Sequence, residues 1–184
     1  MLLLEIIMKR AIKKTLYLFL RLLYKDINKN YEPYSLKELY SYAIKQKIRG
    51  FNRRIPWPVH YTSQIKCPEK IQRGNKYPGY GTSCYIDGRG GIIFEDNVIT
   101  APKISIISQN HDPNDFDKFI ESKPIIIRKN SWIATGATIL PEVELGEHTI
   151  VAAGAVVTKS FSEGNQIIGG NPAKVIKKIG DYKE

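Results

Sequence analysis

The chain has 184 residues, a length that suits a single domain. Hydrophobic residues make up 42% and charged residues 25% of it, which are ordinary values for a globular protein and exclude a chain that is disordered throughout. The two cysteines are too few for a disulfide scaffold or a cysteine-based zinc site, and we expect both to be reduced, buried thiols of a cytoplasmic protein.

The net charge of +10 belongs almost wholly to the first third of the chain. Residues 1–54 contain 13 Lys and Arg against 4 Asp and Glu, whereas residues 55–184 contain 15 against 14. A basic segment of this size indicates an anionic neighbour, such as a membrane surface, an acidic glycan or nucleic acid. Aromatic residues are interleaved with the basic ones, but no nucleic-acid-binding motif is present, and we expect no nucleic acid partner.

Residues 1–25 are predicted to form a basic amphipathic helix. Leu16, Leu20 and Leu23 recur at helical spacing, and the five Lys and Arg among residues 9–21 are too many for a membrane span. The segment is also too long and too interrupted for a signal-peptide core. Two uses of its apolar face remain open. The helix can lie on the inner face of a membrane as a peripheral contact, or it can pack on its own chain or on a neighbouring subunit.

A second helix is predicted from Ser35 to Ile48. Ser35 and Glu38 have the spacing of a capping box, in which the serine caps free N–H groups at the helix start and the glutamate reaches back. Gly50 supplies the stop signal. Two prolines follow in the stretch IPWPVHYTS, which indicates a connector to a different architecture.

From residue 127 onward the sequence repeats every six residues. The first position of six consecutive blocks is aliphatic, namely Ile127, Ile133, Ile139, Leu145, Val151 and Val157. The fifth position is small or apolar, namely Ser131, Ala137, Val143, Thr149, Ala155 and Phe161. The fourth position is Asn130, Gly136, Glu142, His148, Gly154 and Ser160. Three of these residue types, Asn, Gly and His, tolerate the positive φ angle that a tight corner requires.

The same period occurs earlier in the chain. It is carried by Ile86, Ile92, Val98 and Ile104, with Ile65 and Ile71 as a weaker start. A six-residue period predicts a β-helix, in which three short strands close each coil and one aliphatic side chain per strand points inward. The fold class is therefore mainly β, with about four to five stacked coils between residues 65 and 161. Residues 107–124 lack the period, and we expect them to form a protruding loop that carries function.

Four motifs in and around the repeats resemble those of the hexapeptide-repeat O-acetyltransferases, especially the enzymes that acetylate bacterial polysaccharides and sugars. They are Asn110-His111-Asp112, Trp132-Ile133-Ala134, Gly154-Ala155-Val156-Val157-Thr158-Lys159 and Gly170-Asn171-Pro172-Ala173-Lys174-Val175-Ile176. The resemblance covers about residues 60–179. It implies a left-handed parallel β-helix, a homotrimer with active sites at subunit interfaces, acetyl-CoA as co-substrate and a saccharide acceptor.

The chain is therefore expected to have three parts. Residues 1–54 form a basic helical segment, residues 55–179 form a left-handed β-helix acyltransferase domain with the loop 107–124, and residues 180–184 form a tail. The predicted function is transfer of an acetyl group to a sugar hydroxyl of a bacterial surface polysaccharide or its precursor. Two alternatives stay open: another small acceptor, such as an amino sugar, serine or a xenobiotic, and a non-catalytic β-helix subunit used for assembly.

The resemblance assigns His111 as the general base. A hydroxyl that attacks a thioester must lose its proton, and a free imidazole, which titrates near pH ~6.5, can accept that proton and return it to the leaving thiolate. A covalent route would need an activated cysteine or serine, and nothing in the sequence around Cys84 marks it as activated. His60 and His148 are too distant from His111 along the chain to suggest a clustered zinc site, so no metal is expected.

For the co-substrate, the resemblance carries over to small, aromatic and basic residues. These are Trp132, Ala134, Thr135, Ala153, Thr158, Lys159, Lys174 and Lys177. Trp132 matches the family's tryptophan near the cofactor, and Thr135 and Ala153 match contacts to the pantetheine arm. The last four match positions near the nucleotide and its phosphates. The two last lysines keep the charge of the family's arginines but lose the bidentate geometry.

The acceptor site departs from the family. Residues 81–87 read GTSCYID where the sugar acetyltransferases carry an acceptor-site asparagine, and Ser83 or Asp87 can stand in for it. Asn110 and Asp112, which flank the histidine, are further candidate contacts to the acceptor.

Overall fold

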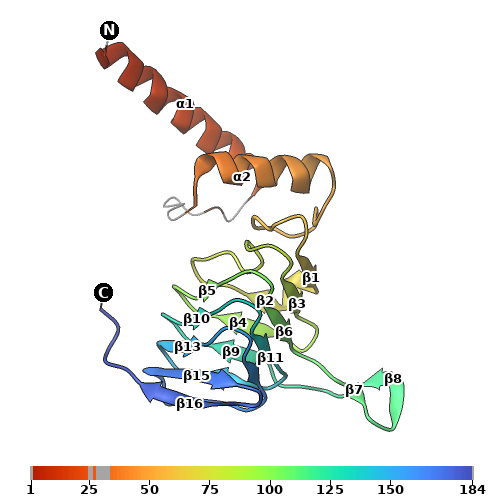
Figure 1. Ribbon diagram of the computed structural model, residues 1–184. Helices are drawn as coiled ribbons and strands as arrows, with labels where there is room; N and C mark the ends of the chain where they lie inside the picture. Colours follow the sequence, from red (N-terminus) through yellow and green to blue (C-terminus); the bar gives the residue numbers. More distant parts are fainter. Residues whose placement is uncertain (1, 25–26, 28–33, 184) are drawn as a thin grey trace. The chain divides into compact units, whose positions relative to one another are not determined.

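The computed structural model describes residues 2–24, 27 and 34–183, with the side chains of residues 2–7, 9 and 10 excepted. The chain divides into two compact units, residues 1–61 and 62–184. The first unit is helical, and the second is a stack of short strands (Figure 1). Within the described residues, no helix contains a stretch that is both long and apolar enough to cross a bilayer.

The helical unit contains the two helices expected from the sequence. α1 spans Leu2–Leu23, so the first predicted helix is confirmed there, while positions 1 and 25 lie outside the described residues. α2 spans Leu36–Ala43 and continues as a π-helix, η1, over Ile44–Ile48. The predicted helix end at Ile48 is thus confirmed.

The serine cap and the glycine stop predicted for this second helix are both present. The hydroxyl of Ser35 accepts a hydrogen bond from the backbone N–H of Glu38 at 3.1 Å, which satisfies a free donor at the helix start. Gly50 adopts a φ of 88°, a left-handed conformation that ends a helix and that glycine adopts without strain.

Gln46 is the polar centre of the helical unit and is only 1% exposed. Its side-chain oxygen accepts hydrogen bonds from the Tyr24 hydroxyl at 2.8 Å and from the backbone N–H of Val59 at 3.1 Å. Its side-chain nitrogen donates to the carbonyls of Ile55 and Trp57 at 3.0 and 2.9 Å. A buried amide is stable only when its polar atoms are bonded in this way, so Gln46 ties the connector to the helices.

The second unit is a parallel β-helix whose strands form three sheets. Sheet A contains β1 (Gln64–Lys66), β3 (Tyr85–Asp87), β6 (Ser105–Ile107), β11 (Thr138–Ile139) and β14 (Val156–Val157). Sheet B contains β2 (Ile71–Gln72), β4 (Ile92–Phe94), β9 (Ile125–Ile127) and β12 (Glu144–Leu145). Sheet C contains β5 (Ile99–Thr100), β10 (Trp132–Ile133), β13 (Thr149–Val151), β15 (Gln166–Gly170) and β16 (Ala173–Lys178). A short 3-10 helix, η2 (Pro68–Lys70), links β1 to β2.

The register of the sheets stacks the aliphatic positions of successive coils. In sheet A, Ile86 pairs with Ile106, Ile106 with Ile139, and Ile139 with Val157, and all four side chains are fully buried. The predicted inward positions from residue 127 onward are confirmed, because the first-position side chains have no exposed surface. Each coil therefore buries its aliphatic side chains against the next, and stability depends on stacking.

The corners also follow the predicted phase. Five of the six fourth-position residues have positive φ angles, namely Asn130, Gly136, Glu142, His148 and Gly154. Glu142, with a φ of 64°, is not a residue type that favours this conformation, so the period of the repeat rather than local preference sets its geometry. The strict pattern ends near Phe161, whose only described β-pairing is an isolated bridge to Leu145.

The last strand reverses the direction of the stack. β16 pairs antiparallel with β15 at the edge of sheet C, and it exposes Lys174, Lys177 and Lys178. Lys178 forms an ion pair with Glu163.

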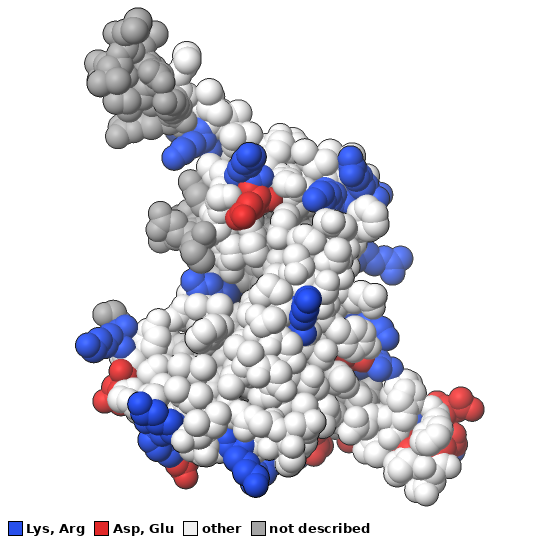
Figure 2. Space-filling view, in the orientation of Figure 1, with Lys and Arg blue, Asp and Glu red and all other residues white. Residues whose placement is uncertain are grey.

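One segment projects from the stack as a hairpin. It contains β7 (His111–Asp112) and β8 (Asp115–Phe119), which lie within the interruption predicted over residues 107–124 (Figure 1). Acidic side chains, red in Figure 2, gather on this hairpin, and Asp115 forms an ion pair with Lys118 there.

Candidate active site

The hairpin leaves the β-helix directly after β6 and returns at β9. Its base is closed by two hydrogen bonds: the backbone N–H of Ile120 donates to the carbonyl of Asn110 at 3.0 Å, and the side chain of Gln109 donates to the carbonyl of Ile120 at 3.2 Å. Sheet A ends and sheet B begins at this corner. His111, at the start of β7, is therefore held above the corner between sheets A and B.

His111 has the geometry of a base with a fixed tautomer. Its ring is exposed, and its Nδ1 lies 2.5 Å from the carbonyl oxygen of Phe116 across the hairpin. A carbonyl oxygen only accepts hydrogen bonds, so Nδ1 carries the proton and donates it. The other ring nitrogen, Nε2, then keeps a free lone pair that can accept a proton.

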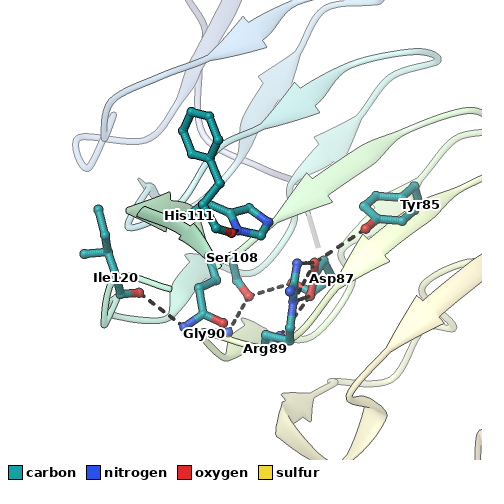
Figure 3. Close-up of polar contacts among 9 residues, drawn as sticks. Tyr85, Asp87, Arg89, Gly90, Ser108, His111 and Ile120 are labelled. Atoms are coloured by element: carbon teal, nitrogen blue, oxygen red, sulfur yellow. Dashed lines mark hydrogen bonds and ion pairs between the residues drawn. The ribbon is translucent and has the colours of Figure 1, made fainter. Parts of the chain in front are cut away.

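His111 is in contact with a series of stacked side chains. The ring of Phe119 lies 4.3 Å from the imidazole between centroids, and the guanidinium of Arg89 lies 4.4 Å above the Phe119 ring. Arg89 in turn holds the carboxylate of Asp87, with its Nη2 2.6 Å and its Nε 3.0 Å from Oδ2 (Figure 3). A cation over an aromatic face is attracted to it, so the three side chains form one connected stack that ends on Asp87.

Asp87 is a buried anion that Arg89 neutralises. Its side chain is 1% exposed, whereas that of Arg89 is 27% exposed. Burial raises the pKa of the Asp87 carboxyl, but the hydrogen bonds and the charge of Arg89 act in the opposite direction and hold that pKa below its usual range. The pair is therefore ionised at neutral pH.

Ser108 ties the root of the hairpin to the same place. Its buried hydroxyl donates to the backbone carbonyl of Asp87 at 2.6 Å and accepts from the backbone N–H of Gly90 at 2.8 Å (Figure 3). A Cβ atom on Gly90 would lie 2.1 Å from the carbonyl oxygen of Ser108, so only glycine permits this close approach of the two backbones.

The other predicted acceptor residues have different surroundings. Asn110 and Ser83 are exposed, and Ser83 adopts a positive φ of 55°. The carboxylate of Asp112 accepts a hydrogen bond from the backbone N–H of Asn114 at 2.8 Å, which shapes the turn of the hairpin. Ser83 lies at the corner before β3, whereas Asn110 lies just before β7 and Asp112 lies in β7.

The predicted groove residues come together at the opposite corner of sheet A. Ala134 and Thr135 follow β10, and Ala153 follows β13, so all three lie where sheet C turns into sheet A. The backbone N–H of Gly154 donates to the carbonyl of Thr135 at 3.0 Å, which stacks the two corners directly. Trp132 projects from β10 beside them and is 47% exposed. Thr135 and Ala153 are small and exposed, so they leave this corner open to an extended ligand, whereas the side chain of Ala134 is buried in the core.

The predicted phosphate contacts lie at the C-terminal end of the stack. Thr158 and Lys159 follow β14, and Lys174 and Lys177 belong to β16, and all four are exposed. Lys159 and the β16 residue Val175 line one shallow cavity of about 240 Å³. The basic side chains are thus free to meet an anionic group.

Within one chain the predicted site residues form two groups. The hairpin group stands at the corner between sheets A and B, and the groove group stands at the corner between sheets C and A. The strands of sheet A run from one of these corners to the other and separate them. A single described chain therefore does not bring His111 to the groove residues.

A cavity of about 380 Å³ opens at the root of the hairpin. Its lining combines apolar residues, among them Ile92, Ile93 and Pro124, with polar ones, namely Lys70, Gln72, Arg89, Gln109, Glu121 and Ser122. The charged, amide and hydroxyl groups of this lining can bond to the hydroxyls of a ligand, and its apolar groups can contact the ligand's carbon atoms.

Neither a metal cluster nor an activated thiol is found in the described part of the chain. No three His, Cys, Asp or Glu side chains gather there as ligands for a metal ion. Cys84 is buried, and burial raises the pKa of its thiol despite hydrogen bonds from its surroundings. Such a thiol is a poor nucleophile.

The stacked hexads define a hexapeptide-repeat protein. The family model "Bacterial transferase hexapeptide (six repeats)" matches residues 124–159. A "Putative acetyltransferase" of Saccharomyces cerevisiae is 31% identical over 174 residues, which are 82% of this chain and 86% of that one. One of Dictyostelium discoideum is 49% identical over 86 residues, only 45% of each chain. The chain belongs to the hexapeptide-repeat acetyltransferase family, and it is an acyltransferase.

Solved structures agree on the fold. A galactoside acetyltransferase in complex with coenzyme A superposes with a TM-score of 0.62 at 24% identity, covering 91% of this chain and 82% of that one. A maltose O-acetyltransferase from Clostridium difficile gives a TM-score of 0.54 at 23% identity, covering 91% and 86%. The expected left-handed parallel β-helix is confirmed.

Proposed function

We propose that the protein is an acetyl-CoA-dependent O-acetyltransferase that acts on a sugar hydroxyl of a bacterial surface polysaccharide or its precursor, with His111 as general base. The observation that carries this proposal is the hydrogen bond from Nδ1 of His111 to the Phe116 carbonyl, which leaves Nε2 free on an exposed ring. Nε2 accepts the proton of the acceptor hydroxyl as that oxygen attacks, and it returns the proton to the departing thiolate. Acetyl-CoA, when bound, supplies the thioester.

The co-substrate is proposed to lie along the corner between sheets C and A. Thr135 and Ala153 are exposed and small, so the pantetheine arm can approach the backbone there, with Trp132 and Ala134 beside it. Thr158, Lys159, Lys174 and Lys177 are proposed to meet the nucleotide and phosphate groups, to which lysine contributes as a point charge. The family relationship supports this assignment.

A homotrimer with active sites at subunit interfaces is proposed for the assembly. The two corners of sheet A that carry His111 and the groove residues are separate in one chain. In a threefold ring, the hairpin of one subunit can stand beside the groove of the next, and the same contact repeats three times. Each active site then takes its base from one subunit and its co-substrate groove from another.

The acceptor is proposed to be a saccharide, bound through Asn110 and Asp112 on the hairpin and through Ser83, which lies at the corner before β3, on the side of the groove residues. The polar side chains in the cavity at the hairpin root support an acceptor with many hydroxyl groups. Asp87 was the fourth candidate, but its carboxylate is already held by Arg89, and we assign it another role below.

An acceptor panel tests this function. The purified protein is given acetyl-CoA and, in turn, oligosaccharides, an amino sugar, serine and a phenicol, and free thiol release is measured. We expect release with a saccharide and little with the others. Release only with the amino sugar, serine or the phenicol would replace the proposed acceptor class. Binding of acetyl-CoA without thiol release in the presence of any acceptor would show that none of the tested compounds is the acceptor. The search would then turn to lipid-linked saccharides.

Helix α1 is proposed to hold the enzyme against the inner, anionic face of the cytoplasmic membrane. Four exposed apolar side chains lie on one side of it, namely Met8, Ile12, Phe19 and Leu22. Three exposed basic side chains lie beside them, namely Lys13, Lys14 and Arg21. An apolar strip flanked by cations matches the boundary between acyl chains and anionic headgroups.

Vesicle sedimentation is expected to detect this contact. The full chain should sediment with vesicles that contain phosphatidylserine at low salt and much less with purely zwitterionic ones, because the cations need anionic lipid. Ile12→Glu should weaken binding by at least about tenfold, since one buried Ile contributes roughly 1.5–3 kcal/mol. The matched control is Ile176→Glu, an exposed isoleucine on β16, which should leave binding unchanged. Equal loss in both variants, or no sedimentation of the wild type, contradicts the proposal.

A further inference from the structure

We propose that the Asp87–Arg89 pair positions the general base, and that it does so by holding the Phe119 side of the hairpin; this inference rests on the proposed role of His111. The pair, the Phe119 ring and the imidazole form a continuous contact from sheet A to the hairpin, with 4.4 Å between Arg89 and Phe119 and 4.3 Å between Phe119 and His111. Arg89 and Phe119 are thus positioning residues that the sequence motifs do not reveal.

The hairpin needs such a support. It has only two short strands, and its register shifts between His111 and Asp112. An isolated two-stranded hairpin is marginally stable at best. All of β8 beyond Asp115 is exposed, so little burial fixes its orientation. The stacking of Phe119 on Arg89 joins β8 to the coil. His111 lies on the other strand, β7, and its ring packs against Phe119.

Arg89 can serve as a support because it is itself immobilised. Its Nε donates to both carboxylate oxygens of Asp87 at 3.0 Å, its Nη2 donates to Oδ2 at 2.6 Å, and its own backbone N–H donates to Oδ1 at 3.2 Å. Asp87 lies in β3, which pairs with β6 immediately before the hairpin leaves. The anchor and the root of the hairpin therefore belong to adjacent strands of one sheet.

The hydrogen bonds that the Asp87 carboxylate already accepts favour a positioning role for it over a contact with the acceptor. The tyrosine hydroxyl of Tyr85 also donates to Oδ2, at 3.5 Å, so the donors around this buried carboxylate already fill the lone pairs of both oxygens. A sugar hydroxyl would have to displace Arg89. Arg89 itself also lines the cavity at the hairpin root, and a direct contact to the acceptor is the competing role for it.

Steady-state kinetics of Arg89 variants separate the two roles. Arg89→Met keeps the length of the side chain but removes its charge, and we expect kcat to fall about 10- to 100-fold, as for a catalytic group displaced by about 1 Å, with KM for both substrates within about twofold. Arg89→Lys retains a cation over the ring and should recover most of kcat. A rise in acceptor KM at unchanged kcat would instead make Arg89 a binding residue and overturn the proposal.

A matched control and a double variant complete the test. Arg128→Met removes a comparable arginine that bridges Glu95 and Glu144 away from the hairpin, and it should leave kcat unchanged. Phe119→Leu should lower kcat like Arg89→Met, and the double variant should lose no more than either single one, because both act through one contact. If the losses of kcat in the two single variants add up in the double variant, the proposal is overturned. It is also overturned if the single variants lose no more kcat than Arg128→Met does. Circular dichroism checks that each variant is folded.

The outcome is distinguishable from failure of the proposed function. Retention of wild-type activity by His111→Ala refutes the base itself, whatever Arg89 does. Loss of activity in His111→Ala with wild-type kcat in Arg89→Met and Phe119→Leu refutes only the positioning role.

Discussion

His111→Ala is expected to lower kcat by about 10²–10⁴-fold while the affinity for acetyl-CoA stays within about twofold. The variant removes the only group in the hairpin whose free nitrogen is prepared, by the hydrogen bond to the Phe116 carbonyl, to accept the acceptor's proton. The predicted co-substrate groove lies at another corner and remains intact. Thiol release at saturating acceptor measures kcat, and titration calorimetry measures acetyl-CoA binding. Turnover within threefold of the wild type would reject His111 as the base.

Mixed assemblies provide the control for the same prediction. Ala153→Trp fills the exposed corner of the groove and should abolish acetyl-CoA binding by steric exclusion. If each site combines the hairpin of one subunit with the groove of the next, co-refolding equal amounts of His111→Ala and Ala153→Trp chains restores about a quarter of wild-type activity, because a quarter of the sites receive both intact parts. A site contained within one chain would give no restoration.

Ile106→Ala is expected to destabilise the β-helix by about 2–5 kcal/mol, whereas Ile106→Val should cost only about 0.5–1.5 kcal/mol. Ile106 is fully buried, and it pairs with Ile86 in the preceding coil and with Ile139 in the next. Truncation to alanine leaves a cavity between three coils, and stacked repeats obtain their stability from contacts with their neighbours. Urea denaturation followed by circular dichroism gives both free energies of unfolding.

Ile106→Ala and Ile106→Val serve as controls for each other, because they remove different volumes from the same buried site. All measurements are made at one protein concentration, because subunit association shifts apparent stability. A loss for alanine no larger than that for valine would mean that the interior of the stack is loosely packed or that the site collapses on truncation.

The fold was predictable from the sequence because the β-helix repeats a local rule. One aliphatic residue every six positions fixes the inward face, and the buried positions from Ile127 to Val157 follow it without exception. The same phase predicts a corner even at Glu142, whose residue type gives no such signal. Gln46 could not be predicted, because its role depends on carbonyl groups of a connector about ten residues away.

The site was predictable only in part. The histidine motif in a non-repeating loop identified His111, and the stretch GTSCYID, residues 81–87, identified Asp87 as a residue of interest. Arg89 and Phe119 were missed, because their contact depends on which corner the hairpin leaves and on how it folds back, and neither follows from spacing. The one available signal was Arg89 two positions after Asp87 in a glycine-rich stretch, because an aspartate side chain in a turn often accepts a hydrogen bond from the backbone two residues on.

The reversed last strand limits growth of the particle. A stack of parallel coils ends in a row of unpaired backbone donors and acceptors, and such a row is a template on which a further coil from another molecule can add. β16 runs against the stack, and it lines the edge of sheet C with Lys174, Lys177 and Lys178. Like charges that face one another at that edge oppose end-to-end polymerisation. The geometry of the stack could otherwise extend as a fibre, and β16 therefore ends its growth at this edge.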